Sequence, residues 1–600
     1  MARVVVEREV QFVSGIETAW AILTDTDRMN RAIGMDKLEL VPLSNGTAAR
    51  YLVKTHIGGM PVEYEERPYE WVYLETFKVF RHMRSGPFRS LEMAFFLRPS
   101  AGGGTTATLR LTVEPRIGLT GLLFKAMGGR TLDAFARAAE QGDRAPAGKQ
   151  RAGGAGARGE VSEAALQRAA KELAAGDHAE IARRLVSFVR DESDHDVSRL
   201  RPFELAERWG EDRRDVLSAC LGAVRAGLLD LRWEIVCPSC RTATEVLPSL
   251  ASLKEHGACQ LCELEFAIDL EEAVEATFGA NAAVRATDSG PYCIGGPART
   301  PHVVAQAILP ARGEGTLFSP PEPGRYRLFV RGGAAVELHV DAAGQPEVRL
   351  RADALGAEPL RVAPRGVLVV ENPSADERHA KIERVTYGDL AARAGVVTAL
   401  PAFRRDFSAD VLRPGTALKV ARVGLFFSDL TGSTQLYADA GDAAAFKLVH
   451  DHFDLVLRVI DQHQGTLVKT IGDAVMAVFA DDLVGLVASV AILGEFEGFR
   501  RDHATRQRTH IKLGVYGGPC YVVTANGVLD YFGQTVNVAA RMQGEAKSGE
   551  LVVEAALADR AIAAGKLDPR LVVERYEARP KGVPTPIAAA RIRVTSAAAK

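Results

Sequence analysis

Residues 420–480 combine apolar, strand-like runs with one long amphipathic segment, and this order limits the possible folds more than any other feature. The first apolar run ends at Asp429, where a Thr/Gly/Ser turn begins. Two later runs are separated by Gly472-Asp473, a pair typical of hairpin turns. Between the first run and the two later ones, apolar residues recur at spacings of three and four, which predicts a helix with one face on a sheet. The residues of that face are Phe446, Val449, Phe453, Val456 and Ile460.

In a strand–helix–hairpin arrangement, the hairpin pairs with the strand that ends at Asp429, so Asp473 approaches Asp429. Two carboxylates about 4 Å apart repel each other by roughly 4 kcal/mol at an effective dielectric constant of about 20. Either one carboxyl group is protonated or a cation lies between them. Hard divalent cations and phosphate-bearing substrates suit such a pair. The turn Thr431-Gly432-Ser433 offers backbone N–H groups to a phosphate chain.

Three stretches of the C-terminal region carry a family pattern: FSDLTGST, KTIGDAVMAVF and DYFGQTVNVAARM. Between roughly residues 420 and 590, the chain resembles the class III nucleotidyl cyclase catalytic domain. The resemblance implies a ferredoxin-like fold and two such domains paired head to tail, with the active sites between them. The loop GVYGGPCYVVTANGVL, which precedes Asp530, departs from the commonest family form, and this leaves the detail of the dimer arm open.

The family motifs imply roles for individual residues. Two aspartates bind two Mg²⁺ or Mn²⁺ ions per active site, and a Lys/Asp pair selects the base. An asparagine orients the ribose, an arginine stabilises the transition state, and a lysine reaches the terminal phosphates. In that order, the residues are Asp429 and Asp473, Lys469 and Asp530, Asn537, Arg541, and Lys581.

The base-selecting pair favours ATP over GTP. Adenine presents an acceptor at N1 and a donor at N6, which a lysine donor and an aspartate acceptor complement, whereas guanine presents the reverse polarity. Asn537 and Arg541 are four residues apart, so both project from one face of a helix. The expected reaction converts ATP to 3′,5′-cyclic AMP and pyrophosphate. A homodimer with two equivalent sites is expected, because one chain carries both sets of residues.

Three other interpretations stay open. A guanylate cyclase is disfavoured by Lys469 and Asp530. A degenerate domain that binds ATP without turnover is disfavoured because both metal aspartates, Asn537 and Arg541 are present. The third is a transcription regulator that reads DNA through the winged-helix region and zinc ribbon of residues 161–282 and senses nucleotide with a cyclase-like domain. Acidic residues balance the arginines of that region, so DNA binding is the less expected function.

Four of the seven cysteines form two Cys-x-x-Cys pairs with eighteen residues between them. This spacing predicts one structural Zn²⁺ per chain, held by four thiolates with no open position for water. Metal binding worth on the order of 10 kcal/mol would stabilise so small a module. The alternative is four unpaired thiols in a reducing compartment. The predicted ligands are Cys237, Cys240, Cys259 and Cys262.

Residues 1–142 contain the stretch TAWAILTDTDRMNRAIG, several alternating runs and a closing amphipathic segment. Helices with one long antiparallel sheet predict an α+β domain. The pattern resembles the helix-grip family of START and polyketide-cyclase-like (SRPBCC) domains, which implies a curved sheet around a long helix and a small apolar ligand. A filled core without a ligand is the alternative. A ligand there would regulate catalysis if it binds two states of the dimer unequally.

A chain of 600 residues is too long for one core. The fold class is multidomain α+β, and the predicted order is a helix-grip domain at 1–142, a flexible linker at 143–160, a helical and winged-helix region at 161–235, a zinc ribbon at 236–282, a small β-sandwich at 283–385, a helical connector at 386–412 and a ferredoxin-like class III cyclase domain at 413–596.

The overall charge and the hydropathy of the chain limit its partners. The formal net charge of −2 argues against a chain built around nucleic acid or anionic lipid. No apolar run approaches the length of a membrane span, and the N-terminal residues lack the apolar region of a signal peptide. We therefore expect a cytoplasmic location without a membrane partner.

Overall fold

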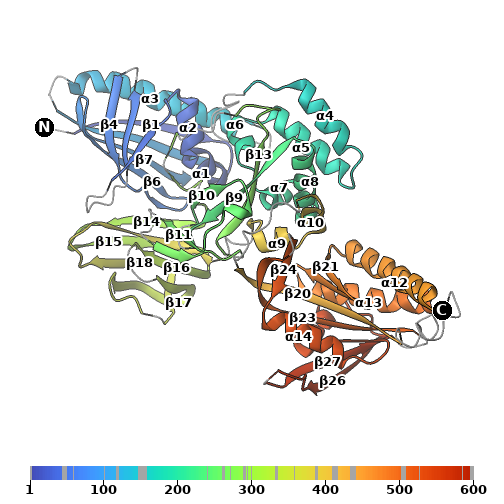
Figure 1. The fold of residues 1–600 in the computed structure, drawn as a ribbon. Coiled ribbons are helices and arrows are strands. Elements are labelled where there is room, and N and C mark those ends of the chain that lie inside the picture. The colour runs from blue at the N-terminus through green and yellow to red at the C-terminus, as the bar shows by residue number, and fades with distance from the viewer. Residues whose placement is uncertain are drawn as a thin grey trace.

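The structure is a computed structural model that describes most residues between 3 and 594. Within that span, the residues that it does not describe are 44–50, 58–59, 101, 117–119, 146–158, 239–240, 260–263, 271, 288–291, 294, 299, 332–334, 357, 386–389, 408–416, 433–440, 502–508, 526–527 and 584. Figure 1 shows several groups of elements that follow one another along the chain. Across the described residues, no helix combines the length and apolar character that crossing a membrane requires.

The N-terminal domain is an antiparallel sheet that packs against the long helix α3 (Figure 1). Aromatic rings fill the space between them, because Phe77 stacks on Phe95 at 5.4 Å between ring centroids and Phe95 lies 6.3 Å from Phe135 of α3. The elements are β1 (Val4–Phe12), α1 (Ile16–Thr24), α2 (Thr26–Ala32), β2 (Glu39–Pro42), β3 (Tyr51–Ile57), β4 (Met60–Glu66), β5 (Glu70–Val72), β6 (Thr76–Met83), β7 (Phe88–Pro99), β8 (Thr105–Pro115) and α3 (Thr120–Asp143).

Residues 163–290 form a group of helices followed by short strands. Their main sheet, of order β10-β9-β13, carries two buried carboxylates that each pair with an arginine: Arg199 with Glu234, and Arg201 with Glu275. The elements are α4 (Glu163–Leu173), α5 (Ala179–Asp191), α6 (Asp194–Ser198), α7 (Pro202–Trp209), α8 (Arg213–Arg225), β9 (Leu229–Val236), β10 (Ala243–Leu247), the 3₁₀ turn Leu250–Ser252, β11 (His256–Cys259), β12 (Leu264–Ala267) and β13 (Val274–Ala280).

The next strands form a β-rich unit that shares a ladder with the N-terminal domain. Strand β14 pairs with β19 on one side and with β5 on the other, where Ala305 lies opposite Val72. The sequence predicts these units as separate domains. Pairing between distant segments leaves no local periodicity, so the sequence pattern does not indicate the shared ladder. The elements are β14 (Val303–Leu309), β15 (Gly313–Phe318), β16 (Gly324–Val330), β17 (Ala335–Arg351), β18 (Leu360–Asn372) and β19 (Arg378–Arg384).

Two short helices, α9 (Ala394–Thr398) and α10 (Pro401–Asp406), connect this region to the C-terminal domain. The sheet of that domain has the order β21-β22-β20-β23-β25-β27-β26, and its first half is a β-α-β-β-α-β unit of the ferredoxin-like kind. The elements are β20 (Ala417–Thr431), α12 (Asp442–Gln462), β21 (Thr466–Ile471), β22 (Ala474–Phe479), α13 (Asp482–Arg501), β23 (His510–Ala525), β24 (Val528–Phe532), α14 (Gln534–Glu545), β25 (Glu550–Glu554), α15 (Ala555–Ala563), β26 (Val572–Ala578) and β27 (Ile587–Arg593).

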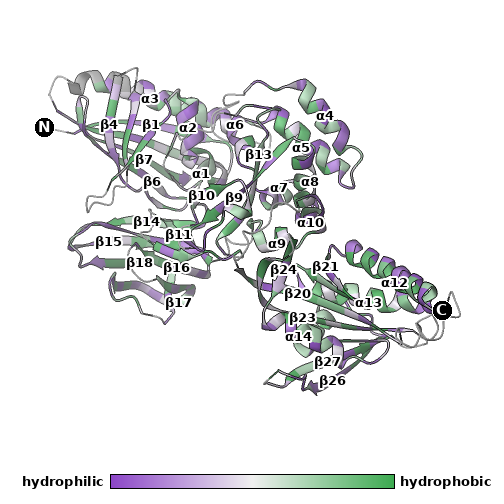
Figure 2. Ribbon diagram, viewed as in Figure 1, coloured by the Kyte–Doolittle hydropathy of each residue, from purple (hydrophilic) through white to green (hydrophobic). Residues whose placement is uncertain are grey.

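Helices cover both faces of this sheet. Helices α12, α13 and α15 share one apolar core with alternate residues of β20 and β22, and α14 packs on the opposite face. Figure 2 shows apolar and polar residues alternating along α12. The prediction that Phe446 faces the sheet is wrong, because this side chain is 67% exposed. The buried arc of α12 is centred on His452, and at about 100° per residue Phe446 falls outside it.

Candidate active site

Strand β20 and the β21–β22 hairpin place Asp429 and Asp473 at neighbouring positions. In the antiparallel ladder between β20 and β22, Ser428 lies opposite Val475. Asp429 is the next residue of β20, and Asp473 lies in the hairpin turn that precedes β22. Gly472 adopts the left-handed backbone conformation of that turn, with φ of +66°. Two carboxylates that are distant in sequence therefore share one edge of the sheet.

The two carboxylates have incomplete partners. Oδ2 of Asp473 is buried and has no hydrogen-bond partner in the described structure. Among the residues that the structure describes, Lys512 of β23 is the cation paired with Asp429, with 3.0 Å between Nζ and Oδ2. A buried carboxylate oxygen without a partner costs free energy unless a proton or a cation binds it. The pair therefore fits a hard divalent cation.

His452 lies on the buried face of α12 and is electrostatically coupled to both aspartates. Burial lowers the pKa of its imidazole, although the carboxylates of Asp473 and Asp429 attract the charged form. Nδ1 lies 2.9 Å from the carbonyl oxygen of Val449, while Nε2 is buried without a hydrogen-bond partner among the described residues. The described residues contain no group of three or more His, Cys, Asp or Glu side chains that could hold a metal.

The expected phosphate-binding turn is described only in part. Thr431 ends β20, and its hydroxyl donates to the carbonyl oxygen of His510 at 3.1 Å. The same hydroxyl oxygen is 3.1 Å from Oγ of Ser548. Gly432 has φ of +85°, a conformation that glycine adopts without strain. Ser433 lies outside the described residues.

Lys469 and Asp530, which the sequence predicts as the base-recognition pair, meet within one chain. Nζ of Lys469 on β21 donates to Oδ2 of Asp530 on β24 at 2.6 Å. The other carboxylate oxygen of Asp530 accepts from the backbone N–H of Tyr531 at 2.8 Å. Asp530 is buried, whereas the Lys469 side chain is 42% exposed. Two residues that are 61 positions apart thus present a donor and an acceptor side by side.

The other expected site residues project into solvent. Asn537 and Arg541 lie one helical turn apart on α14, and both are exposed. Within the described structure, neither side chain makes a hydrogen bond or ion pair. Lys581 is exposed in the turn after β26. These three residues are available to a ligand or a second subunit.

Two of the four predicted zinc ligands are described. Cys237 follows β9 and Cys259 ends β11, and both are buried. Strand β9 pairs in antiparallel with β10, and β11 pairs in antiparallel with β12. The N–H of Cys237 donates to the carbonyl oxygen of Thr242 at 3.0 Å. Cys240 and Cys262 lie outside the described residues.

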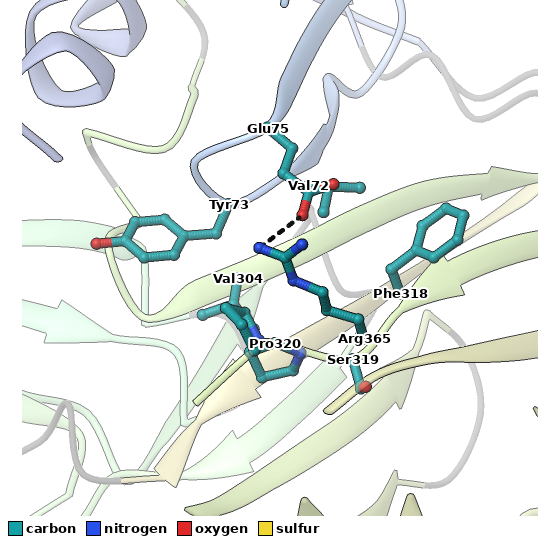
Figure 3. Close-up of a pocket in the computed structure, with 9 residues that line it drawn as sticks. Val72, Tyr73, Glu75, Val304, Phe318, Ser319, Pro320 and Arg365 are labelled. Carbon is teal, nitrogen blue, oxygen red and sulfur yellow. Dashed lines mark ion pairs between the residues drawn. The ribbon is translucent and has the colours of Figure 1, made fainter. Parts of the chain in front are cut away.

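Cavities occur where the upstream domains meet. One of about 230 Å³ lies between the β5–β6 turn and the β-rich unit, where Glu75 and Arg365 form an ion pair at 3.8 Å (Figure 3). A larger cleft of about 1130 Å³ has walls from the N-terminal domain, residues 163–290 and β19. Aromatic residues such as Trp20 and charged residues such as Arg199 line it together.

Three family models match separate parts of the chain. Residues 416–562 match the adenylate and guanylate cyclase catalytic domain, and residues 16–140 match the polyketide cyclase / dehydrase and lipid transport family. The C-terminal part of the chain is a class III nucleotidyl cyclase catalytic domain. The N-terminal part is a polyketide-cyclase-like domain. Residues 163–290 match a family of unknown function, DUF5939, which spans both the predicted winged-helix region and the predicted zinc ribbon.

Curated relatives match the chain over the length of a single domain. Retinal guanylyl cyclase 1 of Rattus norvegicus is 29% identical over 151 residues, which cover 22% of this chain and 13% of that protein. The speract receptor of Strongylocentrotus purpuratus is 31% identical over 132 residues, which cover 20% of this chain and 12% of the receptor. The chain thus spans about an eighth of the length of these relatives.

Solved structures of cyclases are also similar. The adenylyl cyclase CyaB from P. aeruginosa is 20% identical, with a TM-score of 0.27, covering 30% of this chain and 97% of that chain. The guanylyl cyclase Cya2 is 18% identical, with a TM-score of 0.26, covering 30% of this chain and 94% of that chain.

Sequence reasoning missed Lys512 and His452, which interact electrostatically with the predicted metal ligands. Lys512 lies in the alternating run HIKLGV, where a lysine is typical of an exposed strand face. His452 interrupts the apolar face of α12, and that polar residue at a core position was the one available signal.

Proposed function

We propose that the chain is an adenylate cyclase that converts ATP to 3′,5′-cyclic AMP and pyrophosphate at sites shared by two copies. The observation that carries the choice of ATP is the ion pair between Lys469 and Asp530. It presents an N–H donor next to a carboxylate acceptor, the arrangement that complements N1 and N6 of adenine. The cyclase family match supports the class of reaction.

The proposed chemistry assigns each predicted site residue a task. The ribose 3′ oxygen attacks the α-phosphorus, the bond to the β-phosphate oxygen breaks, and its electron pair leaves with pyrophosphate while the hydroxyl proton passes to water. Arg541 neutralises charge that builds on the α-phosphate, and Asn537 orients the ribose. Backbone N–H groups of Thr431-Gly432-Ser433, together with Lys581, hold the phosphate chain.

Asp429 and Asp473 would hold two Mg²⁺ or Mn²⁺ ions per site, which supply Lewis acidity to the 3′ hydroxyl and the triphosphate when bound. Support comes from the unsatisfied Oδ2 of Asp473. Carboxylate oxygens are the donors that these hard cations prefer.

A homodimer is proposed because exposed apolar side chains surround the base-recognition pair. They lie on β21, β23 and β24, the strands that carry or adjoin Lys469 and Asp530. A patch of this kind is typical of surfaces that bind another protein. The residues are Leu467, Ile471, Tyr521, Val528 and Phe532, each between 38% and 52% exposed.

The first experiment measures cyclic product from the purified chain with ATP or GTP and Mn²⁺ or Mg²⁺. Cyclic AMP is the expected product. In the second, equal amounts of Asp429→Ala and Arg541→Ala chains, each inactive alone, are mixed. Random pairing should restore about a quarter of the wild-type rate, because half of the dimers contain one intact site of two. A mixture that stays inactive would contradict shared sites.

A guanylate cyclase is the second candidate, because the curated relatives reported above include guanylyl cyclases. Competition between ATP and GTP in one reaction decides between the two candidates. A transcription regulator has weaker support, since arginines of residues 199–213 form ion pairs with neighbouring glutamates and have less charge to offer phosphate. Salt-sensitive DNA binding would favour it.

We further propose one structural Zn²⁺ bound by Cys237, Cys240, Cys259 and Cys262. The support is that the two described cysteines are buried at the ends of strands that pair in antiparallel with the next strand. Four thiolates suit a closed tetrahedral site. Elemental analysis of protein purified without chelator should find about one zinc per chain. Protein that folds normally and contains no zinc would contradict this assignment.

Regulation by a small apolar ligand of the N-terminal domain is also proposed. Its support is the cleft of about 1130 Å³, which the N-terminal domain shares with residues 163–290. A ligand there would change the cyclase rate only if it binds two states of the dimer unequally. Deleting residues 1–142 should alter the rate or its response to ligand, and an unchanged rate and response would contradict regulation.

A further inference from the structure

The connector helices α9 and α10 lie between residues 163–290 and the cyclase sheet, beside β21 and β24 (Figure 1). Phe403 of α10 is buried, with its ring edge-on to Trp233 of β9 at 5.8 Å. Leu529 and Tyr531 of β24 belong to the same apolar core. One continuous core therefore joins the upstream region to the strand that carries Asp530.

Arg404 of α10 spans this junction. Its Nη1 donates to the carbonyl oxygen of Leu529 at 3.0 Å, and its Nε donates to the carbonyl oxygen of Thr398 at 3.1 Å. The guanidinium carbon lies 5.2 Å from the centre of the Tyr531 ring. Among the described residues, no carboxylate pairs with Arg404, and its Nη2 is buried without a hydrogen-bond partner. A planar, fixed fork of donors thus ties two backbone segments together.

Strand β24 is short and lies at the edge of its ladder. It has five residues, Val528–Phe532, and among the described strands it pairs with β23 alone. Arg404 binds the carbonyl group of the residue directly before Asp530. Short edge strands with free backbone groups are readily displaced unless something covers them.

The connector also holds the strand that carries Lys469. The hydroxyl of Thr466, the first residue of β21, donates to the carbonyl oxygen of Ala399, which lies between α9 and α10. The ladder between β21 and β22 is irregular between Leu467 and Lys469. The connector therefore contacts both strands of the base-recognition pair, close to the residues that form it.

We propose that Arg404 is a positioning residue for purine recognition, which fixes β24 on the connector and so sets the Asp530 carboxylate against Lys469. This role rests on the proposed cyclase function. Discrimination between adenine and guanine requires the donor and acceptor to be held in place, because a mobile carboxylate accepts from either base. The structure thus extends base selection to a residue outside the cyclase fold.

The test measures the ratio of cyclic AMP to cyclic GMP formed from an equimolar mixture of ATP and GTP with Mn²⁺. This ratio does not depend on how much of the enzyme is folded. Arg404→Met should lower the ratio about fivefold to tenfold, the size expected when a hydrogen bond in the recognition site is weakened. Arg404→Lys should restore part of it. The matched control is Arg405→Met, since Arg405 is exposed and pairs with Asp406.

A double-mutant cycle shows whether Arg404 acts through Asp530. In an Asp530→Asn background, Arg404→Met should change the product ratio less than twofold, because the carboxylate that it positions is gone. Independent, multiplicative effects would overturn the positioning role, as would an active Arg404→Met enzyme with an unmoved ratio. A wild-type chain that cyclises neither nucleotide would overturn the proposed cyclase function, and the positioning role that rests on it would fall too.

Discussion

Lys469 and Asp530 form a complete ion pair in one chain, whereas Asp429 and Asp473 carry charge that their neighbours only partly balance. Asp530 is buried and uses both carboxylate oxygens. Within the described part of the chain, Asp473 has a buried oxygen without a hydrogen-bond partner, and Asp429 pairs with one lysine. Under the proposed function, the fold itself builds the base-recognition pair, while ions and substrate complete Asp429 and Asp473.

The largest expected effect comes from the metal aspartates. Asp473→Asn should lower the cyclisation rate by about 10³-fold, because a neutral amide cannot hold the cations that stabilise the transition state. Thermal stability without divalent cations should stay equal or rise, since an unsatisfied buried charge is removed. Rate and melting assays measure both. Asp568→Asn, at an exposed aspartate, is the control, and a variant within tenfold of wild type would contradict the metal role.

The base-recognition pair should respond differently. Lys469→Gln should lower kcat/KM for ATP about tenfold to a hundredfold, which corresponds to one hydrogen bond to a charged group. The Mn²⁺ concentration that gives half-maximal rate should remain unchanged, because the metal aspartates are intact. Steady-state kinetics over a grid of ATP and Mn²⁺ separates the two effects. Lys566→Gln, at an exposed lysine, is the control, and a matching shift in Mn²⁺ dependence would remove the distinction between the pairs.

The placement of these residues follows from local sequence signals to an unequal degree. Asp429 and Asp473 could be placed because a strand end and a Gly-Asp hairpin turn are short-range features. Lys469 and Asp530 could be assigned from family motifs, but their contact joins β21 to β24, and no periodicity in the sequence encodes that pairing.

Contacts between domains were beyond sequence reasoning altogether. Arg404 lies in a short helix whose pattern predicts only a connector, and its role depends on a carbonyl group 125 residues away. The ladder between β5 and β14 was equally unpredictable. Each strand pairs on one side with a strand of its own unit, β6 or β19, and on the other side with a strand of a different unit. Phe446 shows the converse error, because its spacing fitted the helix face while its angle lay outside the buried arc.

A smaller effect should follow from Lys512, which competes with cations for Asp429. Lys512→Met should strengthen Mn²⁺ binding to the nucleotide-free protein about twofold to fivefold, as expected for loss of a partly exposed ion pair. Calorimetric Mn²⁺ titration measures this. Lys447→Met removes a longer and more exposed lysine–aspartate pair on α12 and should leave binding unchanged. Weaker Mn²⁺ binding in Lys512→Met would mean that the lysine supports the metal aspartates instead of opposing the ion.

The smallest effect concerns His452 and the pH dependence of stability. Burial lowers the pKa of its imidazole, so the folded chain binds fewer protons than the unfolded chain once the pH falls below about 6.5, the ordinary histidine value. Stability from this residue is therefore present above that pH and is lost as the pH falls. Between pH 7 and pH 5.5, the melting temperature should fall about 1–3 °C further in wild type than in His452→Gln.

The control for this last measurement is His450→Gln, because His450 is exposed on the same helix and should leave the pH profile unchanged. Mn²⁺ sharpens the test. Asp473 and Asp429 attract the charged imidazole in the metal-free protein, and a cation on those carboxylates cancels that attraction. The pH dependence that His452 contributes should then become steeper with Mn²⁺ present. An unchanged slope would mean that a cation on Asp429 and Asp473 does not alter the pKa of His452. The charge of these carboxylates would then have no effect on the buried face of α12.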